Sequence, residues 1–242
     1  MANDFNHENT YRRMIWRFYR KAATDIQAII NMNLDGGQVR DYDKLTSELD
    51  RYAQALELPA SLLWGKVIKR QAVTLAKDFK AVAGLKIDPQ SAQMRALVER
   101  LVREKVDLIK TLPRNSAVEA QKMSAEIALS TGKRHETLIA KIQGLAAGYP
   151  EYAARRIART EVARTQSQLV QAQAQSIGGN QYVWKTVKDE AVRESHKEMD
   201  GKICSFDDPP EVEPGKFYHP GGIYNCRCYP APLLPRLIEE DK

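Results

Sequence analysis

The residues best suited to chemistry are gathered in the last quarter of the chain. All three cysteines and two of the four histidines fall within the 45 residues from Trp184 to Cys228. They are Cys204, Cys226, Cys228, His196 and His219. Thiolate and imidazole groups are the usual ligands of structural zinc, which takes four of them in a tetrahedron. The pattern predicts a zinc site formed by the three cysteines and His196, with His219 as the alternative histidine.

Two other uses of these side chains stay open. Cys226 and Cys228 form a Cys-x-Cys pair, which is tighter than the common Cys-x2-Cys spacing, and Cys204 lies 22 residues before Cys226. The cysteines can instead be reduced thiols packed as small hydrophobic groups beside a hydrogen-bonded histidine. A thiol and His196 could also act as nucleophile and base. No phosphate-binding glycine loop or oxyanion-hole motif accompanies the pair, so we expect no enzyme and no small-molecule substrate.

The composition and the N-terminal residues indicate the kind of compartment in which the protein resides. The chain has 242 residues, 43% of them hydrophobic and 28% charged, and its apolar runs are too short to span a membrane. The N-terminus lacks the basic and apolar regions of a signal peptide. We therefore expect a reducing compartment without a disulfide framework, in agreement with the odd number of cysteines.

Charge is distributed unevenly along the chain. The net charge is +6, and residues 61–176 carry 20 Lys and Arg against 10 Asp and Glu. Residues 177–242 carry 9 against 12. A basic helical surface can contact nucleic acid or an acidic protein, whereas the alternative is a set of solvated helix faces without a ligand.

The elements that position these side chains follow from hydrophobic spacing. Apolar residues recur every three or four positions, which predicts amphipathic helices over five stretches. These are residues 9–31, 41–56, 61–83, about 90–112 and 151–175, with another helix after Pro113 that breaks near Thr131 and Gly132. Pro59 and Pro113 are expected to end helices.

The pattern changes at Gly178 and Gly179. Residues 181–187 and 202–206 predict strands, residues 189–199 a short helix, 207–222 a loop and 224–229 a third strand. The predicted fold class is mainly α: an elongated helical body over residues 1–176 and a small α+β domain over residues 177–242.

An ordered set of residues in this region resembles the Mu F-like minor head proteins of tailed phages. It begins on a predicted helix and ends at the Cys-x-Cys pair, covering roughly residues 150–230. The matching residues are Arg159, Thr160, Glu161, Trp184, Arg193, His196, Asp200, Gly201, Asn225, Cys226, Arg227 and Cys228.

The resemblance implies a phage virion protein, present in few copies, that acts in head morphogenesis. It implies a portal, capsid or scaffold protein as partner, a place inside the head or at the portal vertex after assembly in the host cytoplasm, and ejection with the DNA. Some relatives carry a toxin or enzyme module after this motif. The chain ends 14 residues after Cys228, so we expect no such module.

The N-terminal helix offers a candidate docking surface. Its aromatic residues are of the types that dominate binding energy at protein interfaces, and its polar face is rich in Arg. The candidate partner-binding residues are Tyr11, Trp16, Phe18 and Tyr19. The alternative function is a zinc-stabilised nucleic-acid-binding protein whose basic middle helices follow the phosphate backbone of phage DNA.

Overall fold

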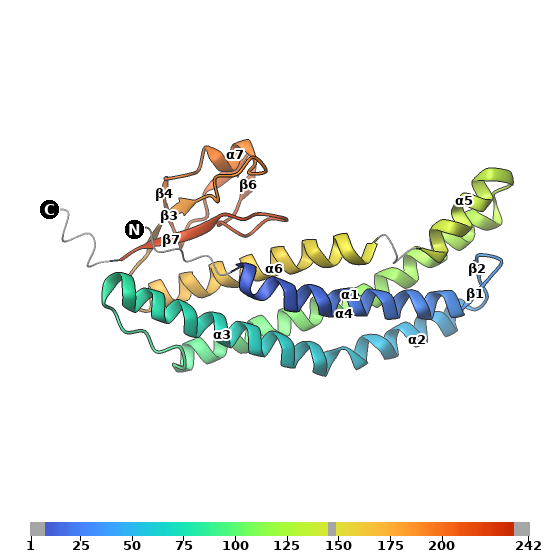
Figure 1. Cartoon of the computed structure of the whole chain (residues 1–242), viewed down its shortest axis with the longest axis horizontal. Coiled ribbons are helices and arrows are strands. Elements are labelled where there is room, and N and C mark those ends of the chain that lie inside the picture. The colour runs from blue at the N-terminus through green and yellow to red at the C-terminus, as the bar shows by residue number, and fades with distance from the viewer. Residues whose placement is uncertain (1–7, 145–148, 235–242) are drawn as a thin grey trace. The chain divides into compact units, whose positions relative to one another are not determined.

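The structure is a computed structural model that describes residues 8–144 and 149–234. By its internal contacts the chain divides into two compact units. Unit 1 comprises residues 1–13, 65–101 and 156–242, and unit 2 comprises residues 14–64 and 102–155. Figure 1 labels the elements along the chain. The site residues singled out in the sequence between Arg159 and Cys228 all belong to unit 1.

Helices dominate both units. They are α1 (Glu8–Met32), α2 (Tyr42–Ala55), α3 (Glu57–Ala83), α4 (Ala92–Ala128), α5 (Gly132–Gln143), α6 (Tyr149–Gln175) and the short α7 (Glu194–Lys197). The predicted class, mainly α with a small α+β part near the C-terminus, is confirmed. Across the described residues, no helix has the length and apolar character needed to cross a membrane.

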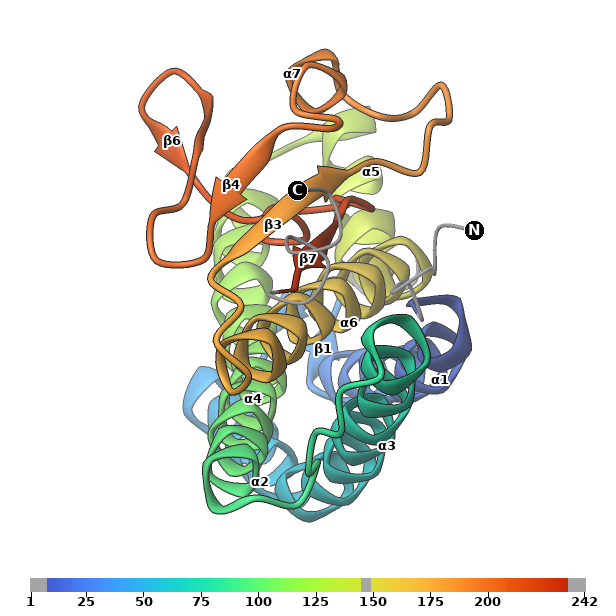
Figure 2. The same cartoon turned by 90° about the vertical axis from the view of Figure 1, so that its left-hand side faces the viewer.

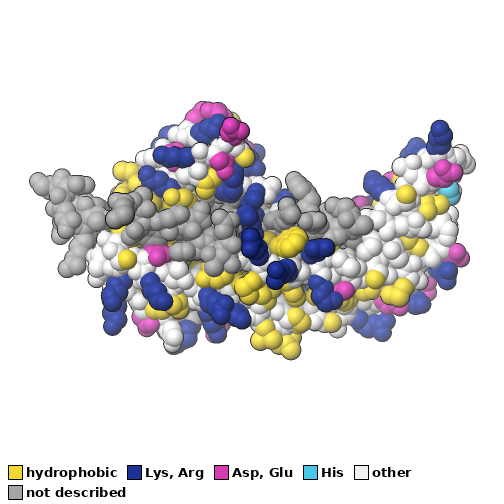
Figure 3. All heavy atoms as spheres, viewed as in Figure 1, with side chains coloured by type: hydrophobic (Ala, Val, Ile, Leu, Met, Phe, Trp, Pro, Cys, Tyr) yellow, Lys and Arg dark blue, Asp and Glu magenta, His cyan; other side chains and the backbone are white. Residues whose placement is uncertain are grey.

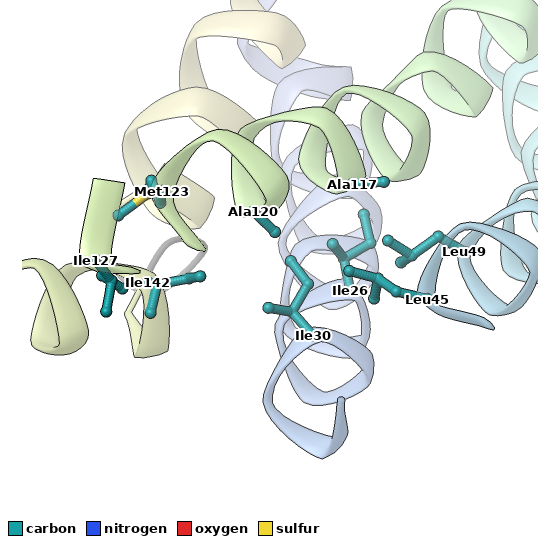
Figure 4. Packing of buried hydrophobic residues seen from close by; sticks show 9 residues of the cluster. All are labelled: Ile26, Ile30, Leu45, Leu49, Ala117, Ala120, Met123, Ile127 and Ile142. Atoms are coloured by element: carbon teal, nitrogen blue, oxygen red, sulfur yellow. The ribbon is translucent and has the colours of Figure 1, made fainter. Parts of the chain in front are cut away.

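The core of unit 2 joins α1, α2, α4 and α5, and consecutive core residues within each of the first three helices are three or four positions apart (Figure 4). The buried cluster consists of Ile26, Ile30, Leu45, Leu49, Ala117, Ala120, Met123, Ile127 and Ile142. Small residues of α4 face larger ones of α1 and α2, which allows close packing of the helices. A short hairpin of β1 (Leu34–Asp35) and β2 (Gln38–Val39) is fixed by a bond from the Val39 N–H to the Ser124 hydroxyl, 2.8 Å long.

The helix predicted over residues 41–56 ends as expected, at Ala55, but the predicted start of the next helix at residue 61 and the predicted helix end at Pro113 are wrong. Pro59 lies in the first turn of α3, where a backbone N–H is not needed, so the helix begins at Glu57 before it. Pro113 lies inside α4, which runs on without a break to Ala128. The Thr111 hydroxyl donates to the Leu108 carbonyl at 2.6 Å, close to the site where the proline interrupts the backbone bonds.

In unit 1, α6 is the helix against which the C-terminal residues fold. It carries several buried polar side chains, among them Thr160, Glu161, Thr165 and Gln173. The Gln173 amide donates to the Ala72 carbonyl of α3 at 2.8 Å, which ties α6 to the helical part of this unit. The predicted helix over residues 151–175 is confirmed, with two more residues at its start.

A three-stranded antiparallel sheet follows, with β3 (Gln181–Lys185) between β4 (Ile203–Ser205) and β7 (Tyr229–Leu233) (Figure 2). Tyr182 and Trp184 of β3 are fully buried on one face, as alternation in the sequence predicts. Pro230 and Pro232 are tolerated in β7 because it is an edge strand of this sheet.

Three predictions for this region need correction. The third strand occupies residues 229–233 rather than 224–229, because Asn225 has a left-handed backbone (φ 58) that interrupts an extended chain. The predicted helix over 189–199 shrinks to the four residues of α7. The predicted loop contains a hairpin of β5 (Glu211–Glu213) and β6 (Lys216–Phe217), which turns at Gly215.

Candidate metal centre

Three of the predicted ligands meet in the interior of unit 1. His196 comes from α7, and Cys226 and Cys228 come from the loop before β7. The Nδ1 atom of His196 lies 3.3 Å from Sγ of Cys228 and 3.5 Å from Sγ of Cys226. All three ligand atoms are within 4.8 Å of one another, and each side chain is at most 5% exposed. This buried group could bind a metal ion.

Cys204 and His219 lie in a different place. Cys204 is on β4, opposite Tyr182 of β3, and it is not part of the group of three. His219 accepts or donates through Nδ1 to the Tyr182 hydroxyl at 3.0 Å and packs its ring near Phe206. The structure thus brings together three of the five candidate ligands and sets the other two around Tyr182.

The loop that carries the cysteines is held by α6. The Thr160 hydroxyl accepts a hydrogen bond of 3.1 Å from the Asn225 N–H, and the Arg164 guanidinium donates to the Gly222 carbonyl at 2.9 Å. Gly221 approaches the helix so closely that an added Cβ would lie 2.9 Å from the Ala163 carbonyl oxygen. Its φ of +80 also favours glycine. Three successive points of the loop are therefore fixed on one turn of α6.

Further bonds fix the loop on its other side. Arg193, the residue before α7, donates to the Tyr224 carbonyl at 2.9 Å. Arg227 points away from the cluster and forms a two-pronged ion pair with Asp189. The arginine between the two cysteines thus stays outside, while both thiols face inward.

Tyr218 and Trp184 contact the His196 ring directly, and Glu213 is linked to it through Tyr218. The His196 Nε2 atom lies 3.1 Å from the Tyr218 hydroxyl, which donates to Glu213 Oε1 at 3.3 Å. The Trp184 ring meets the imidazole edge-on with centroids 5.7 Å apart. Tyr218 and Glu213 are not among the residues that the sequence pattern predicts for the site. Both residues are positioned by the β5–β6 hairpin, which lies in the stretch predicted to be a loop. The Pro214-Gly215 pair is the sequence feature that could have indicated this hairpin.

Asp200 serves the strand rather than the histidine. Its carboxylate accepts from the Thr186 N–H at 2.8 Å and from the Thr186 hydroxyl at 3.1 Å. Gly201, with φ +87, then donates its N–H to the Trp184 carbonyl at 2.8 Å. This Asp-Gly pair turns the chain from α7 back into β4, so it positions His196 beside Trp184.

The electrostatics of the thiol pair favour a single negative charge. A hydrogen bond from Cys228 is the main reason that the pKa of the Cys226 thiol is lowered, and the bond from the Gly221 N–H acts in the same direction. The hydrogen bond with Cys226, followed by burial, raises the pKa of Cys228. Burial, with the charge of Glu213, raises the pKa of Tyr218 to about 12, so its hydroxyl stays a donor.

Comparison with known proteins bears on this same region. Residues 120–230 match the family described as Phage Mu protein F like protein. This segment of the chain is similar to the Mu F-like family. An uncharacterized protein of Haemophilus influenzae is 33% identical to the chain over 137 residues, which make up 57% of this chain and 29% of that relative. The chain therefore spans less than a third of the length of this relative. No solved structure matches this chain.

The residues on which the resemblance was recognised have structural tasks in the Mu F-like segment. Thr160 holds the Asn225 turn, Glu161 is buried and paired with Arg164 at 3.5 Å, and Arg159 directly precedes Thr160 on α6. Asp200 and Gly201 form the turn into β4, and Trp184 packs against His196. The cysteine loop is fixed through Arg193, Asn225 and Arg227. His196, Cys226 and Cys228 form the cluster. The predicted family resemblance is confirmed over the matched residues.

The four aromatic residues proposed as docking anchors differ in exposure. Tyr11 is 6% exposed and Tyr19 is 1% exposed, so both belong to the interior of the chain. Trp16 and Phe18 are half-buried. The Arg20 guanidinium stacks over the Trp16 ring at 5.4 Å from its centroid. A docking surface on α1 is thus reduced to Trp16, Phe18 and the arginines beside them.

Proposed function

We propose that this chain is a virion protein of a tailed phage that acts in head morphogenesis. The observation that carries the proposal is the match of residues 120–230 to the Mu F-like family, because this segment contains the complete His/Cys cluster and the helix turn that holds its loop. In this role the cluster is structural and catalyses nothing. It keeps residues 218–228 folded against α6.

We place the protein inside the head or at the portal vertex, with the portal as its main partner. The surface of α1 supports this assignment. Arg17 and Arg20 are exposed, three residues apart, and the half-buried Trp16 and Phe18 are the neighbours of Arg17 in the chain. Arginine and aromatic side chains at the same surface favour a protein partner, since these types account for most interface hot spots. Capsid or scaffold proteins are the other candidates.

The experiment is incorporation into heads. A tagged copy of the chain is expressed in cells that produce the phage, heads are purified on a density gradient, and the chain is quantified by mass spectrometry. We expect it in heads in a small, fixed number of copies. Its absence from purified heads, with the protein folded in the cells, contradicts the proposal.

Point substitutions then test the α1 surface. Deletion of the whole helix is unsuitable because Ile26 and Ile30 belong to the core of unit 2. We expect Arg17→Glu combined with Phe18→Ala to reduce incorporation at least about tenfold, which corresponds to ~1.4 kcal/mol of binding energy. The matched control is Arg103→Glu, at an exposed position of α4. Equal loss in both variants would show that charge alone, rather than this surface, is responsible.

DNA is a second partner supported by charge. Lys and Arg side chains recur along the helices on the face shown in Figure 3, and residues 61–176 hold twice as many of them as Asp and Glu. Binding to phosphates releases counterions, so affinity should fall steeply with salt and be independent of sequence. Fluorescence anisotropy with two unrelated duplexes at several salt concentrations measures this. Affinity that does not change with salt contradicts a role for these basic side chains.

A further inference from the structure

Around His196 three metal-ligating atoms meet, and hydrogen bonds to Tyr218 and Gly221 hold two of their side chains in place. We propose that His196 Nδ1, Cys226 Sγ and Cys228 Sγ bind one Zn²⁺ ion, and that Tyr218 and Glu213 hold the imidazole in the tautomer that this requires. Cys204 and His219 are not ligands in this proposal. The ion is thus bound by three protein atoms from α7 and the loop before β7.

The spacing of the ligand atoms fits zinc. Bonds of about 2.0–2.1 Å to nitrogen and 2.3 Å to sulfur at a tetrahedral angle put N and S about 3.6 Å apart. The observed distances from His196 Nδ1 are 3.3 Å and 3.5 Å. Both thiols reach this position because the intervening Arg227 is turned outward by Asp189. The protein therefore holds both sulfurs at nearly the separation from the nitrogen that the ion needs, and the two sulfurs lie within 4.8 Å of each other.

Tyr218 and Glu213 set the protonation of the histidine. The Tyr218 hydroxyl donates to the Glu213 carboxylate, so it is left to accept from Nε2–H of His196. Nδ1 then carries the free lone pair, and it is the atom that faces the sulfurs. Metal-binding histidines commonly donate their other ring N–H to a neighbouring acceptor in this way, which fixes the ring and strengthens the ligand.

Buried thiolates also need hydrogen-bond donors and a counter-charge. The Gly221 N–H lies 3.3 Å from Cys226 Sγ. The Trp184 indole N–H is fully buried, is a donor to Cys228, and belongs to the ring that packs edge-on against His196. Two thiolates and one Zn²⁺ sum to zero charge. Together they avoid the free-energy cost of burying the thiolates or the ion as an unpaired charge. Soft sulfur ligands favour zinc over magnesium or calcium.

The fourth ligand is not supplied by the described part of the chain. There the cluster comprises one histidine and two cysteines, and Tyr218 is bonded on the far side of the imidazole. A zinc ion with three protein ligands keeps its fourth position for water or an external ligand. We infer a bound water molecule at that position, shielded from bulk solvent by the burial of all three ligands.

The first test is metal content. The full chain is expressed without added metal, purified without chelators, and analysed by inductively coupled plasma mass spectrometry. We expect one zinc per chain. Cys226→Ser and Cys228→Ser should each lose most of it, whereas the matched control Cys204→Ser should keep it. Zinc well below one per chain in folded wild-type protein, after incubation with Zn²⁺, overturns the proposal, as does a Cys226–Cys228 disulfide in freshly purified protein.

A second test stays informative even if the cysteine variants do not fold. Co²⁺ replaces zinc in wild-type protein, and the absorption spectrum should show thiolate-to-cobalt charge transfer and the strong visible bands of a four-coordinate ion. Tyr218→Phe should keep this spectrum at saturating metal and weaken metal affinity by about 10- to 100-fold. An affinity equal to wild type would overturn the assigned role of Tyr218. A spectrum without charge transfer would overturn thiolate ligation.

Discussion

Gly221 shows how one residue can decide the position of the cysteine loop. Its backbone is left-handed, with φ +80, and it approaches the Ala163 carbonyl of α6 too closely for a side chain. Gly215, in the β5–β6 hairpin, has a similar φ of +72, but nothing lies within 4 Å of the place where its Cβ would be. A side chain at Gly215 would meet only the strain of a left-handed backbone, whereas one at Gly221 would also clash with α6.

We expect Gly221→Ala to destabilise the protein more than Gly215→Ala. A left-handed alanine costs roughly 1–2 kcal/mol at either position, and the clash with Ala163 adds about 1–3 kcal/mol at position 221. Urea unfolding followed by circular dichroism measures both changes in the free energy of unfolding. Equal effects would mean that the loop can move away from α6 without loss.

His219 predicts a dependence of stability on pH. Burial lowers the pKa of this imidazole, and it is the main cause. The unfolded chain therefore takes up the proton first as the pH falls. This contribution to stability is fully present above the ordinary histidine pKa of about 6.5 and is lost as the pH falls below it toward the folded pKa.

The measurement compares wild type with His219→Asn, whose amide can still bond to the Tyr182 hydroxyl but does not titrate near neutral pH. We expect the free energy of unfolding to fall less steeply in the variant between about pH 7 and 5. The comparison cancels the carboxylates and His196, which both proteins share. Parallel pH profiles would contradict a buried neutral His219.

At the scale of elements, Pro113 has a different effect in the folded protein from the one that its local chemistry predicts. Pro113 favours a helix end because it lacks an N–H and crowds the preceding turn. The structure nevertheless continues α4 through it. Ala117, Ala120, Met123 and Ile127 on the far side all enter the unit 2 core. Their burial outweighs a local defect of about 3 kcal/mol.

Pro113→Ala should consequently stabilise the protein. The alanine restores a backbone bond within α4, and the expected gain is about 1–2 kcal/mol after allowing for the buried ring that is lost. Asn115→Ala, two residues further along at an exposed position, is the matched control and should gain no more than about 0.5 kcal/mol. A loss of stability in thermal unfolding of Pro113→Ala would show that the packing requires the distortion of the helix.

At the scale of the whole molecule, the division between body and C-terminal domain is still a proposal. The predicted domain begins at residue 177, yet Thr160, Ala163 and Arg164 of α6 contact the loop that carries the cysteines. Gln171 also donates to the Phe206 carbonyl at 3.1 Å. These contacts place part of the support of the small domain before Gly178.

We therefore expect a fragment of residues 177–242 to be less stable than one of residues 149–242. Both lack α3 and α4, so the difference reports on α6 alone. Amide dispersion in two-dimensional NMR spectra is the measurement, and a peptide of residues 149–176 added in trans should restore the spectrum of the shorter fragment. A shorter fragment that is as well folded alone would establish residues 177–242 as an independent domain.

The sequence by itself determined the helical class, the change of pattern at Gly178, the burial of Tyr182 and Trp184, and the family resemblance. These features depend on local periodicity and on an ordered set of residue types, which are legible without knowledge of distant contacts. It also placed the metal candidates in one short stretch. It could not separate Cys226 and Cys228 from Cys204, since all three have the same chemistry.

Only the tertiary structure decided which candidates meet. The left-handed turn at Asn225, held by Thr160 from 65 residues earlier, points both loop thiols at His196. The pairing of β4 with β3 instead places Cys204 beside Tyr182. Tyr218 and Glu213 join the site through a hairpin whose turn is short and whose strands are too brief to show periodicity. Such contacts depend on packing between segments far apart in the chain, which local spacing does not encode.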